Sequence, residues 1–570
     1  MKNKLVADIL NRVADILEFQ DVEFKPQAYR KVALAVESLT EDIADVYNRG
    51  ELENIPGVGK HIAEKVSEII EKGKSGYYEK LKKEVPIDLE SLGEIPFLGI
   101  KKIQVLYQKL GVKTVADLEK ALQDHKVREL PGFGEKTEMV LLKGIEVIRT
   151  RPRRFLYAQV VLIVNDVLQR LGKSSLVKRV EVAGSFRRGK ETVGDLDFLV
   201  ISSSPSKVMD LFVTLPGVVE VLSKGTTKSS VRLENGLSID LRVVGEKEFG
   251  SAMNYFIGNK EHNVALRKFA LSKGYTLSEY GLFTVKKKRW IAGRTENEIY
   301  DKLGMNYIEP ELRENRGEIA VALKRTLPSL VAKKDIRGVF HNHSTWSDGN
   351  DSLLAMAQKA EQMGFEFVSF NDHYGHIGIT NPLNEKRLVN YLAEIEIVRK
   401  KVGIRVFSGV EIDIFKDGTL PLSRAKLRAL DVVVASVHVG LSMSENEMTK
   451  RVCTAMENYP IHILGHPMDR ILNVREPLSL RLDDVFDTAR RNNVFLEINA
   501  APQRMDLSGM EIKSARDKGC LFALSTDAHD VRGLEAYSYG VLSARRGWLE
   551  KKDVLNCWNL KKIEKRFWKS

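Results

Sequence analysis

The stretch GSFRRGKETVGDLDFLV (residues 184–200) decides the fold of the first part of this chain. A Gly-Ser turn and two arginines precede a D-x-D pair, Asp195 and Asp197, which opens an apolar run. Alternation along a strand points residues two apart to the same face. Two carboxylates on one face, after a glycine-rich turn with Ser185 and Arg188, can hold Mg²⁺ ions against a triphosphate. A D-x-D pair alone is usually solvated in a loop, so it is the upstream turn that favours a metal site.

A third acid, Asp240, lies in the apolar segment LSIDLRVV (residues 237–244), whose composition predicts a strand. If this strand neighbours the first one, Asp240 lies beside Asp195 and Asp197. Three carboxylates are what a two-metal phosphoryl-transfer site needs, because the ions activate a hydroxyl and stabilise charge in an in-line displacement. The alternation around Asp240 is equally compatible with an edge strand whose aspartate points to solvent. The pairing of the three acids is therefore a prediction.

These segments resemble the nucleotidyltransferase palm of the family X DNA polymerases, which fill gaps in DNA repair. The resemblance continues through FGSAMNYFIGNKEHNVALR (residues 249–267) and EIYDKLGMNYIEPELRE (residues 298–314). It implies an α+β palm and thumb, two Mg²⁺ or Mn²⁺ ions at the three aspartates, and dNTPs and gapped DNA as partners. It also implies that Ser185, Arg188 and Gly194 hold the triphosphate, that Tyr255, Phe256 and Gly258 line the sugar, and that Asn263 and Arg267 contact the nascent base pair and the template.

Composition and charge set the broad class of the protein. A chain of 570 residues is too long for one core, so several domains are expected. Residues 1–334 carry 56 basic and 46 acidic residues, a net charge of +10, and residues 335–570 carry 33 and 31, a net charge of +2. The basic N-terminal part suggests a polyanionic partner, although a lysine-rich surface alone would give the same excess.

The three cysteines form no C-x-x-C pair, and no apolar run reaches the length of a membrane span. Widely spaced cysteines fit a reducing compartment. We therefore expect a monomer in the cytoplasm, associated with the nucleoid through DNA and without membrane contact.

Three N-terminal segments resemble one another and the helix-hairpin-helix motif: IPGVGKHIAEKV (residues 55–66), IPFLGIKKIQVLYQKLG (residues 95–111) and LPGFGEKTEMVLLKGI (residues 130–145). Each has a glycine turn before a helical pattern. Glycine lets the backbone approach a phosphate, and the N–H groups at the start of the following helix point at it. Such contacts bind nucleic acid without reading its sequence. The predicted DNA-contacting glycines are Gly57, Gly59, Gly99, Gly132 and Gly134.

The first copy lies in a longer resemblance to the lyase domain of family X, which includes FKPQAYRKVA (residues 24–33). By that resemblance, Lys65 matches the lysine that forms a Schiff base with a 5′-deoxyribose phosphate. Lys25 and Tyr29 match positions of the 5′-phosphate pocket. A lysine whose pKa is lowered by nearby cations can do this chemistry. A phosphate-binding or surface role for Lys65 is at least as compatible with the sequence.

The last part of the chain holds a separate set of metal-ligand residues. Most follow short apolar runs, and repeated strands separated by helical stretches suggest a (β/α) barrel, in which strand ends converge on one mouth. Six histidines and three acids at such a mouth can bind up to three ions such as Mn²⁺, Zn²⁺ or Fe²⁺. The predicted ligands are His341, His343, Asp348, His373, Glu411, His438, His466, Asp527 and His529.

This set resembles the PHP (polymerase and histidinol phosphatase) domain, whose H-x-H, D-H, G-H-P and D-x-H signatures all have counterparts here. The resemblance implies a distorted α/β barrel of about seven strands and a metal-dependent phosphoesterase. Arg470, just after G-H-P, could contact a substrate phosphate. With both halves together, the chain resembles the bacterial and archaeal family X polymerases that carry a C-terminal PHP domain.

We therefore expect a multidomain DNA polymerase with a PHP-domain 3′–5′ exonuclease and possible incision at abasic sites. The expected domains are a lyase-like helical domain (1–85), a second helix-hairpin-helix domain (86–150), a palm (151–245), a dNTP-selecting subdomain (246–315), a linker (316–334) and a PHP domain (335–570). Two alternatives remain: a nucleotidyltransferase fused to a small-phosphoester phosphatase, and a DNA-binding scaffold without activity. The three hairpins argue against the first alternative, and the complete acid and ligand sets argue against the second.

Overall fold

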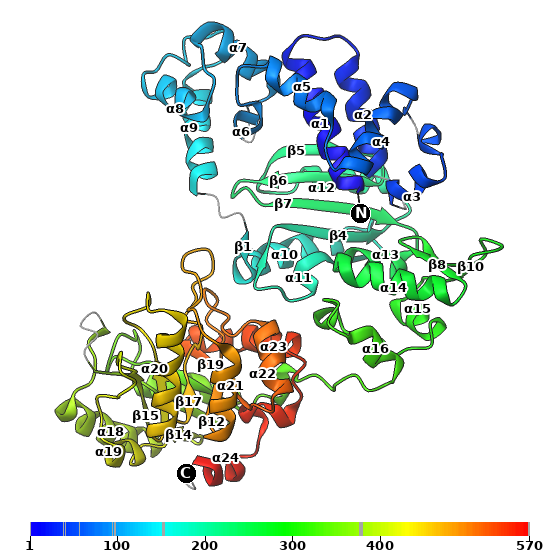
Figure 1. Cartoon of the computed structure of the whole chain (residues 1–570). Coiled ribbons are helices and arrows are strands. Elements are labelled where there is room, and N and C mark those ends of the chain that lie inside the picture. The colour runs from blue at the N-terminus through cyan, green and yellow to red at the C-terminus, as the bar shows by residue number, and fades with distance from the viewer. Residues whose placement is uncertain are drawn as a thin grey trace.

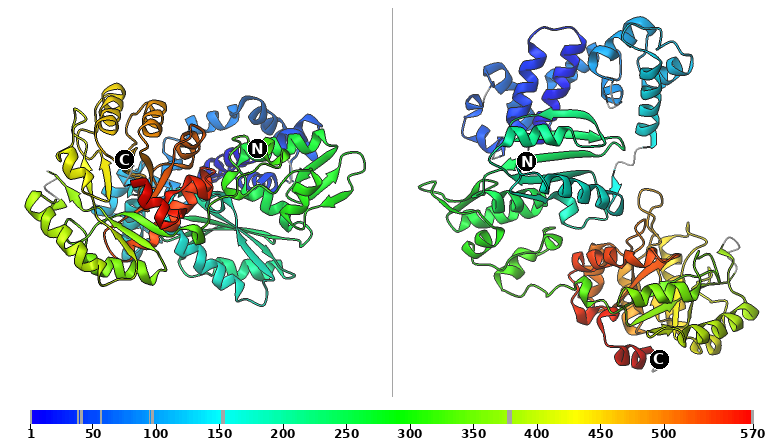
Figure 2. Two further views of the ribbon diagram at one scale, coloured as in Figure 1. Left: turned by 90° about the horizontal axis from the view of Figure 1, so that it is seen from below. Right: turned by 180° about the vertical axis from the view of Figure 1, so that it is seen from behind.

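The computed structural model describes residues 2–37, 39, 42–55, 57–93, 95, 98–150, 154–375 and 380–567. The chain forms a helical N-terminal part, a central part built on a mixed sheet, and a C-terminal α/β barrel (Figure 1). The helical part lies beside one face of the central part, and the barrel lies on the opposite side, as the views from below and behind also show (Figure 2). This order confirms the predicted fold class.

The N-terminal part packs its helices around one hydrophobic core. That core runs without a break from Val6 in the first helix to Ile145 in the last, so the two predicted N-terminal domains share it. The helices are α1 (Asn3–Phe19), α2 (Lys25–Glu37), α3 (Ile43–Asn48), α4 (Lys60–Lys72), α5 (Gly76–Glu84), α6 (Leu89–Gly93), α7 (Ile100–Leu110), α8 (Val115–Gln123) and α9 (Glu135–Thr150).

The palm is a mixed sheet backed by α10 (Tyr157–Gly172) and α12 (Pro205–Val213). Its strand order is β2 (Arg179–Val182), β4 (Asp195–Ile201), β7 (Ser238–Val244), β6 (Lys228–Leu233) and β5 (Val218–Lys224). The one-turn helix α11 (Gly184–Arg187) joins β2 to the short strand β3 (Thr192–Val193), which pairs with β1 (Phe155–Leu156). The turn between β2 and β4 is therefore held close to the start of β4.

The thumb combines two helices with a small antiparallel sheet. Its elements are α13 (Phe249–Ile257), α14 (Lys260–Ser272), β8 (Tyr275–Ser278), β9 (Gly281–Thr284), β10 (Trp290–Ala292) and α15 (Glu296–Lys302). The helix α16 (Glu318–Leu323) follows and occupies the start of the segment that the sequence predicts as a linker. Ala322 of α16 packs in the same core as Leu303 after α15, so this segment continues the thumb.

The C-terminal barrel is built from parallel strands with helices outside. Its strands are β11 (Gly338–Asn342), β12 (Phe367–Phe370), β13 (His373–Tyr374), β14 (Arg405–Phe407), β15 (Gly409–Asp413), β16 (Val432–Ser436), β17 (Ile463–Leu464), β18 (Phe495–Asn499) and β19 (Phe522–Ala528). Its helices are α17 (Leu353–Gln362), α18 (Glu385–Arg399), α19 (Arg424–Arg428), α20 (Glu445–Asn458), α21 (Leu482–Arg491), α22 (Gly509–Asp517), α23 (Tyr537–Arg546) and α24 (Leu560–Phe567).

The described residues give this sheet nine strands, where the sequence predicts about seven. The difference comes from two interruptions. Only two residues separate β12 from β13, and one separates β14 from β15. Because β12 pairs with β14, β13 with β15, and β19 with β11, seven staves close the barrel. In the described part of the chain, no helix combines the length and apolar character needed to cross a membrane.

Candidate active sites

The three palm carboxylates lie on neighbouring strands. β4 and β7 are parallel, and Asp197 is the direct register partner of Asp240. Asp195 faces the same side, two residues before Asp197, because side chains alternate along the strand. β7 is an interior strand between β4 and β6, so the alternative of an edge-strand Asp240 does not apply. Lys228 on β6 lies 3.6 Å from the Asp240 carboxylate.

The carboxylates crowd one another strongly enough to change their ionisation. Burial, followed by the charges of Asp195 and Asp240, raises the pKa of Asp197 to about 7. Like charges held this close favour either a proton or a cation between them. The donor set therefore fits the divalent ions that the sequence predicts.

A glycine lets the phosphate-binding turn touch this cluster. Gly184 has a left-handed φ of 64°, and a Cβ there would lie 2.6 Å from Oδ2 of Asp197. Arg188 follows the turn and is mostly buried, and its Nε donates to Oε1 of Glu314 at 2.9 Å. Ser185 lies on the same short helix, and Gly194 directly precedes β4. The predicted triphosphate residues thus gather at one end of β4.

The predicted sugar-side residues close the other wall. Tyr255 and Phe256 end α13 with their rings edge to face at 5.0 Å, and Gly258 follows with a φ of 70°. Arg188 reaches this wall, because its Nη1 donates to the carbonyl of Ile257 at the end of α13. Asn263 on α14 donates to the carbonyl of Tyr255 at 2.7 Å. Triphosphate and sugar-side residues are therefore directly linked.

Arg267 lies apart from this wall, in a groove between the thumb and the N-terminal part. The groove has a volume of about 940 Å³ and is lined by α3, α14, β8 and β9. Lys268 and Lys288 also line it. Its cations suit a nucleic-acid backbone more than a base edge.

The glycine turns of the N-terminal part have the open geometry that phosphate approach requires. Gly59 and Gly99 precede α4 and α7 directly, and a Cβ at either would meet no atom within 4 Å. Gly134 directly precedes α9 and is equally open. Gly57 and Gly132 have left-handed φ angles of 87° and 83°. The predicted glycines thus expose backbone at the start of long helices.

Lys65 lies among aromatic rings on α4. Its ammonium group is 4.5 Å from the ring centre of Tyr77 and donates to the carbonyl of His61. Tyr29 is buried and stacks on Tyr77 at 6.4 Å, whereas Lys25 is exposed at the start of α2. Tyr77 is a residue that the sequence does not single out, since nothing distinguishes it from its neighbour Tyr78.

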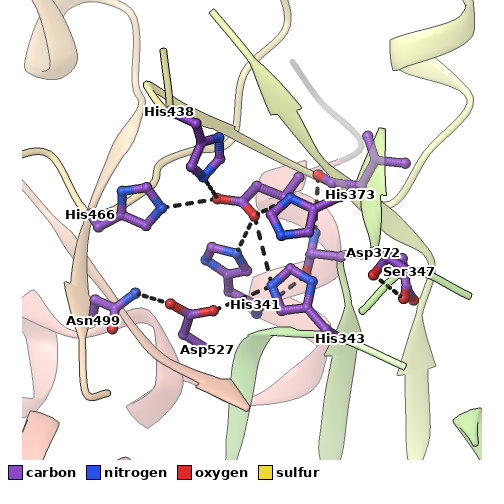
Figure 3. Close-up of polar contacts among 12 residues, drawn as sticks. His341, His343, Ser347, Asp372, His373, His438, His466, Asn499 and Asp527 are labelled. Carbon is purple, nitrogen blue, oxygen red and sulfur yellow. Dashed lines mark hydrogen bonds and ion pairs between the residues drawn. The ribbon is translucent and has the colours of Figure 1, made fainter. Parts of the chain in front are cut away.

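The predicted metal ligands of the barrel converge at the ends of its strands (Figure 3). Three groups have ligand atoms within 4.8 Å of one another: His343, Asp348, His373 and His529; His341, His343 and Asp527; and His373, Glu411 and His438. The remaining ligand, His466, joins them through Glu411, whose Oε1 is 3.0 Å from its Nε2. All nine predicted ligands therefore lie in one cluster.

Glu411 is the centre of this cluster. Its Oε2 lies 2.9 Å from His373 Nδ1 and 3.3 Å from His341 Nε2, and its Oε1 lies 3.2 Å from His438 Nε2. Burial disfavours the charge of Glu411, but the surrounding imidazoles outweigh burial and hold its pKa well below its usual value. A carboxylate with both oxygens facing imidazoles is suited to bridge two cations.

A second row of carboxylates orients the imidazoles. Glu497 lies 2.6 Å from Nδ1 of His341, and Asp413 lies 2.7 Å from Nδ1 of His438. Such partners leave the other ring nitrogen to face the metal. Within the described residues, Nε2 of His341 and both ring nitrogens of His343 are buried and make no hydrogen bond. These orphaned nitrogens fit a metal centre.

Several ligands occupy strained backbone. His341, His466 and Asp527 have positive φ angles of 54°, 22° and 50°. Such conformations cost a non-glycine residue about 1–3 kcal/mol, and they persist where the surrounding structure fixes them. The strain therefore coincides with the metal-ligand positions.

Arg470 has a different place from the one the sequence suggests. Its Nε donates to the carbonyl of Arg504 at 3.0 Å, and its Nη2 lies 3.9 Å from Glu191 of the palm. Arg504 instead approaches the ligands, with Nε 3.6 Å from Asp527 and Nη1 2.7 Å from Asp469. Arg504 is thus the arginine closer to a phosphate at the metals, and no short motif marks it.

Five domain-family models match the chain in the order of its parts. They are a helix-hairpin-helix domain (residues 1–75), a SAM-like helix-hairpin-helix tandem (89–142), the DNA polymerase beta palm (152–249), the DNA polymerase beta thumb (252–314) and the PHP domain (340–501).

Known proteins match over different lengths. The DNA polymerase/3′-5′ exonuclease PolX of Bacillus subtilis (strain 168) is 34% identical over 568 residues, which cover 99% of each chain. DNA polymerase lambda of Rattus norvegicus is 26% identical over 340 residues, 55% of this chain and 56% of its own. DNA polymerase lambda of Arabidopsis thaliana is 26% identical over 345 residues, 55% of this chain and 62% of its own.

The polymerase lambda matches cover only about half of this chain, whereas the Bacillus match covers palm, thumb and barrel together. The barrel holds the full ligand cluster, and the palm holds three facing aspartates. Since the end-to-end match and the domain models agree, this chain belongs to the PolX family, the family X DNA polymerases that carry a C-terminal PHP domain.

Proposed function

We propose that this chain is a DNA-directed DNA polymerase and a 3′–5′ exonuclease that fills short gaps during base excision repair. The observation that supports it most is the in-register pair Asp197 and Asp240, with the glycine turn of Gly184 packed against it. A small-metabolite enzyme would not need the three open glycine turns of the N-terminal part.

In the polymerase site, two bound Mg²⁺ or Mn²⁺ ions supply hydroxyl activation and charge stabilisation. Asp195, Asp197 and Asp240 hold these ions against the triphosphate. Ser185 and Arg188 orient the triphosphate, while Gly194 leaves room beside it. Tyr255, Phe256 and Gly258 press against the sugar, and Asn263 holds the Tyr255 carbonyl so that this wall keeps its place.

In the barrel, up to three Mn²⁺, Zn²⁺ or Fe²⁺ ions supply a hydroxide nucleophile and polarise the phosphate. Glu411 spans the cluster, and Glu497 and Asp413 keep His341 and His438 oriented. Arg504 is close enough to the cluster to neutralise a phosphate oxygen. The same chemistry suits removal of a 3′ nucleotide and incision at an abasic site.

The DNA partner that best fits the chain is a short gap with a 5′-phosphate. The open turns at Gly59, Gly99 and Gly134 can bind backbone phosphates on both sides of the gap without reading sequence. Binding should weaken steeply with salt, because each phosphate contact releases counterions. We propose that the protein acts as a monomer in the cytoplasm, where DNA is its main partner.

The test is a product analysis on one DNA. Pure protein is incubated in Mn²⁺ with a 5′-phosphorylated one-nucleotide gap, with and without dNTPs. Extension with dNTPs and 3′ shortening without them is the expected result. An intact primer in both reactions, together with phosphate release from histidinol phosphate, would instead support the fused transferase and phosphatase. Tight DNA binding with no product of any kind would support an inactive scaffold.

A second activity, 5′-deoxyribose-phosphate lyase, is favoured by the surroundings of Lys65. Its ammonium group lies beside Tyr77, which stacks on the buried Tyr29. Borohydride should trap the wild type on a 5′-deoxyribose-phosphate end, and Lys65→Ala should lose the adduct. Lys72→Ala, a change at a surface lysine paired with Glu68 on the same helix, is the matched control. Equal trapping of wild type and Lys65→Ala would count against the lyase.

A further inference from the structure

The turn that carries the triphosphate residues rests on a helix of the C-terminal domain. Gly189 has a φ of 67°, and a Cβ there would lie 3.3 Å from Cδ2 of Leu542 on α23. Tyr539 on α23 meets the ring of Tyr157 edge-on at 6.1 Å, and that ring stacks on Phe186 at 4.5 Å. The PHP domain therefore packs directly behind the polymerase turn.

Arg546, the last residue of α23, makes the polar contacts at this junction. Its side chain is 3% exposed, and its Nη1 donates to the carbonyl of Arg188 at 3.0 Å. The same Nη1 lies 3.5 Å from Oε1 of Glu314, the oxygen that accepts from Nε of Arg188. Arg546 thus holds both the backbone of Arg188 and the carboxylate that orients its side chain.

Charges around Arg546 balance at the buried junction. Glu314 also accepts from Lys190 at 3.1 Å. Glu191 of the palm lies 3.9 Å from Arg546 and 3.9 Å from Arg470, both in the PHP domain. Burial opposes ionisation of Glu191, but these two arginines outweigh burial and lower its pKa. Removing one guanidinium would leave buried negative charge short of a partner.

We propose that Arg546 of the PHP domain is a positioning residue of the polymerase nucleotide site. This inference rests on the proposed polymerase function. Arg546 fixes Arg188 in the orientation that meets the triphosphate, and its charge keeps Glu314 from repelling that triphosphate. Loss of a hydrogen bond to a charged group should weaken dNTP binding on the order of tenfold. The effect should fall on the KM for dNTP more than on kcat, because Arg546 does not approach the aspartates.

The test compares Arg546→Met with Arg545→Met, a matched control. Arg545 is the neighbouring residue of the same helix and also crosses the interface, but it contacts Glu311 at 2.6 Å and not the triphosphate turn. Single-nucleotide gap filling gives the KM and kcat of each protein. Barrel nuclease activity and the melting temperature report whether the variants are folded.

A KM for dNTP raised on the order of tenfold in Arg546→Met, with kcat and nuclease near wild type and Arg545→Met unchanged, is the expected result. Arg546→Lys, which keeps the charge and one donor, should recover part of the loss. Wild-type KM in Arg546→Met, or equal KM changes in both methionine variants, would overturn the positioning role. If Arg546→Met does not fold, an unchanged KM in Arg546→Lys would overturn it as well. Absence of incorporation by the wild type would instead overturn the proposed function, and this inference with it.

Discussion

Replacing Gly184 by alanine should damage polymerisation far more than stability. The left-handed φ of 64° costs alanine about 1–2 kcal/mol. The new Cβ would lie 2.6 Å from Oδ2 of Asp197, and an ordinary contact begins at 3.4 Å, so the carboxylate must move by about 0.8 Å. The end of a side chain can make this movement with little further loss of stability. The same oxygen, however, faces the proposed ions, and a misplacement near 1 Å can cost on the order of 100-fold in rate.

Gly217→Ala provides the matched control. Gly217 lies in the same domain with a φ of 83°, and a Cβ there would meet no atom within 4 Å. The two variants should therefore share the backbone strain, and each should melt a few degrees below the wild type. Only Gly184→Ala should also displace Asp197.

Single-turnover incorporation at a one-nucleotide gap, beside calorimetric melting, separates the two effects. We expect Gly184→Ala to lose on the order of 100-fold in rate and Gly217→Ala to retain the wild-type rate. The nuclease of both variants should be unchanged, since neither glycine contacts the barrel. A Gly184→Ala protein that polymerises at the wild-type rate, or a Gly217→Ala protein with an equal loss, would refute the steric reasoning.

Two further outcomes follow from the same geometry. The double change Asp195→Asn with Asp197→Asn should abolish primer extension and spare 3′ shortening, and His341→Ala with His343→Ala should do the reverse; loss of both activities in either folded variant would contradict two separate sites. Burial opposes ionisation of Glu314, but its cations outweigh burial and lower its pKa to about 2, so its stabilising contribution is complete above its ordinary pKa of 4.5 and is lost as the pH falls from 4.5 toward 2. Melting temperatures measured across that window should therefore fall less steeply for Glu314→Gln than for the wild type, and parallel curves would contradict this.

The sequence predicts the metal-binding residues well because their chemistry is written locally. Asp195 and Asp197 share a face through simple alternation, and the barrel ligands follow short apolar runs whose ends must meet. The pairing of Asp240 with Asp197 needed the strand order, since alternation alone also allowed an edge strand. Local pattern therefore gave the residue types, and topology gave their partners.

Other features depend on contacts between segments that carry no local signal. Glu497 and Asp413 look like any strand carboxylates until they are seen behind His341 and His438. The split strands of the barrel could not be read from apolar runs, because a one- or two-residue interruption leaves the run intact. Arg546 is one arginine among many, and its role exists only where two domains meet.

The order of strands in the barrel also sets a timetable for synthesis. β11, which carries His341, pairs with β19, which carries Asp527, and about 180 residues separate the two strands. At about 5–20 residues per second, a ribosome needs roughly 9–36 s to cover that distance. Palm and thumb are complete before the barrel can close, so each newly made molecule should be able to fold its synthetic part well before its degradative part. Arg546 emerges only after β19, which means that the nucleotide site receives its last support at the end of translation.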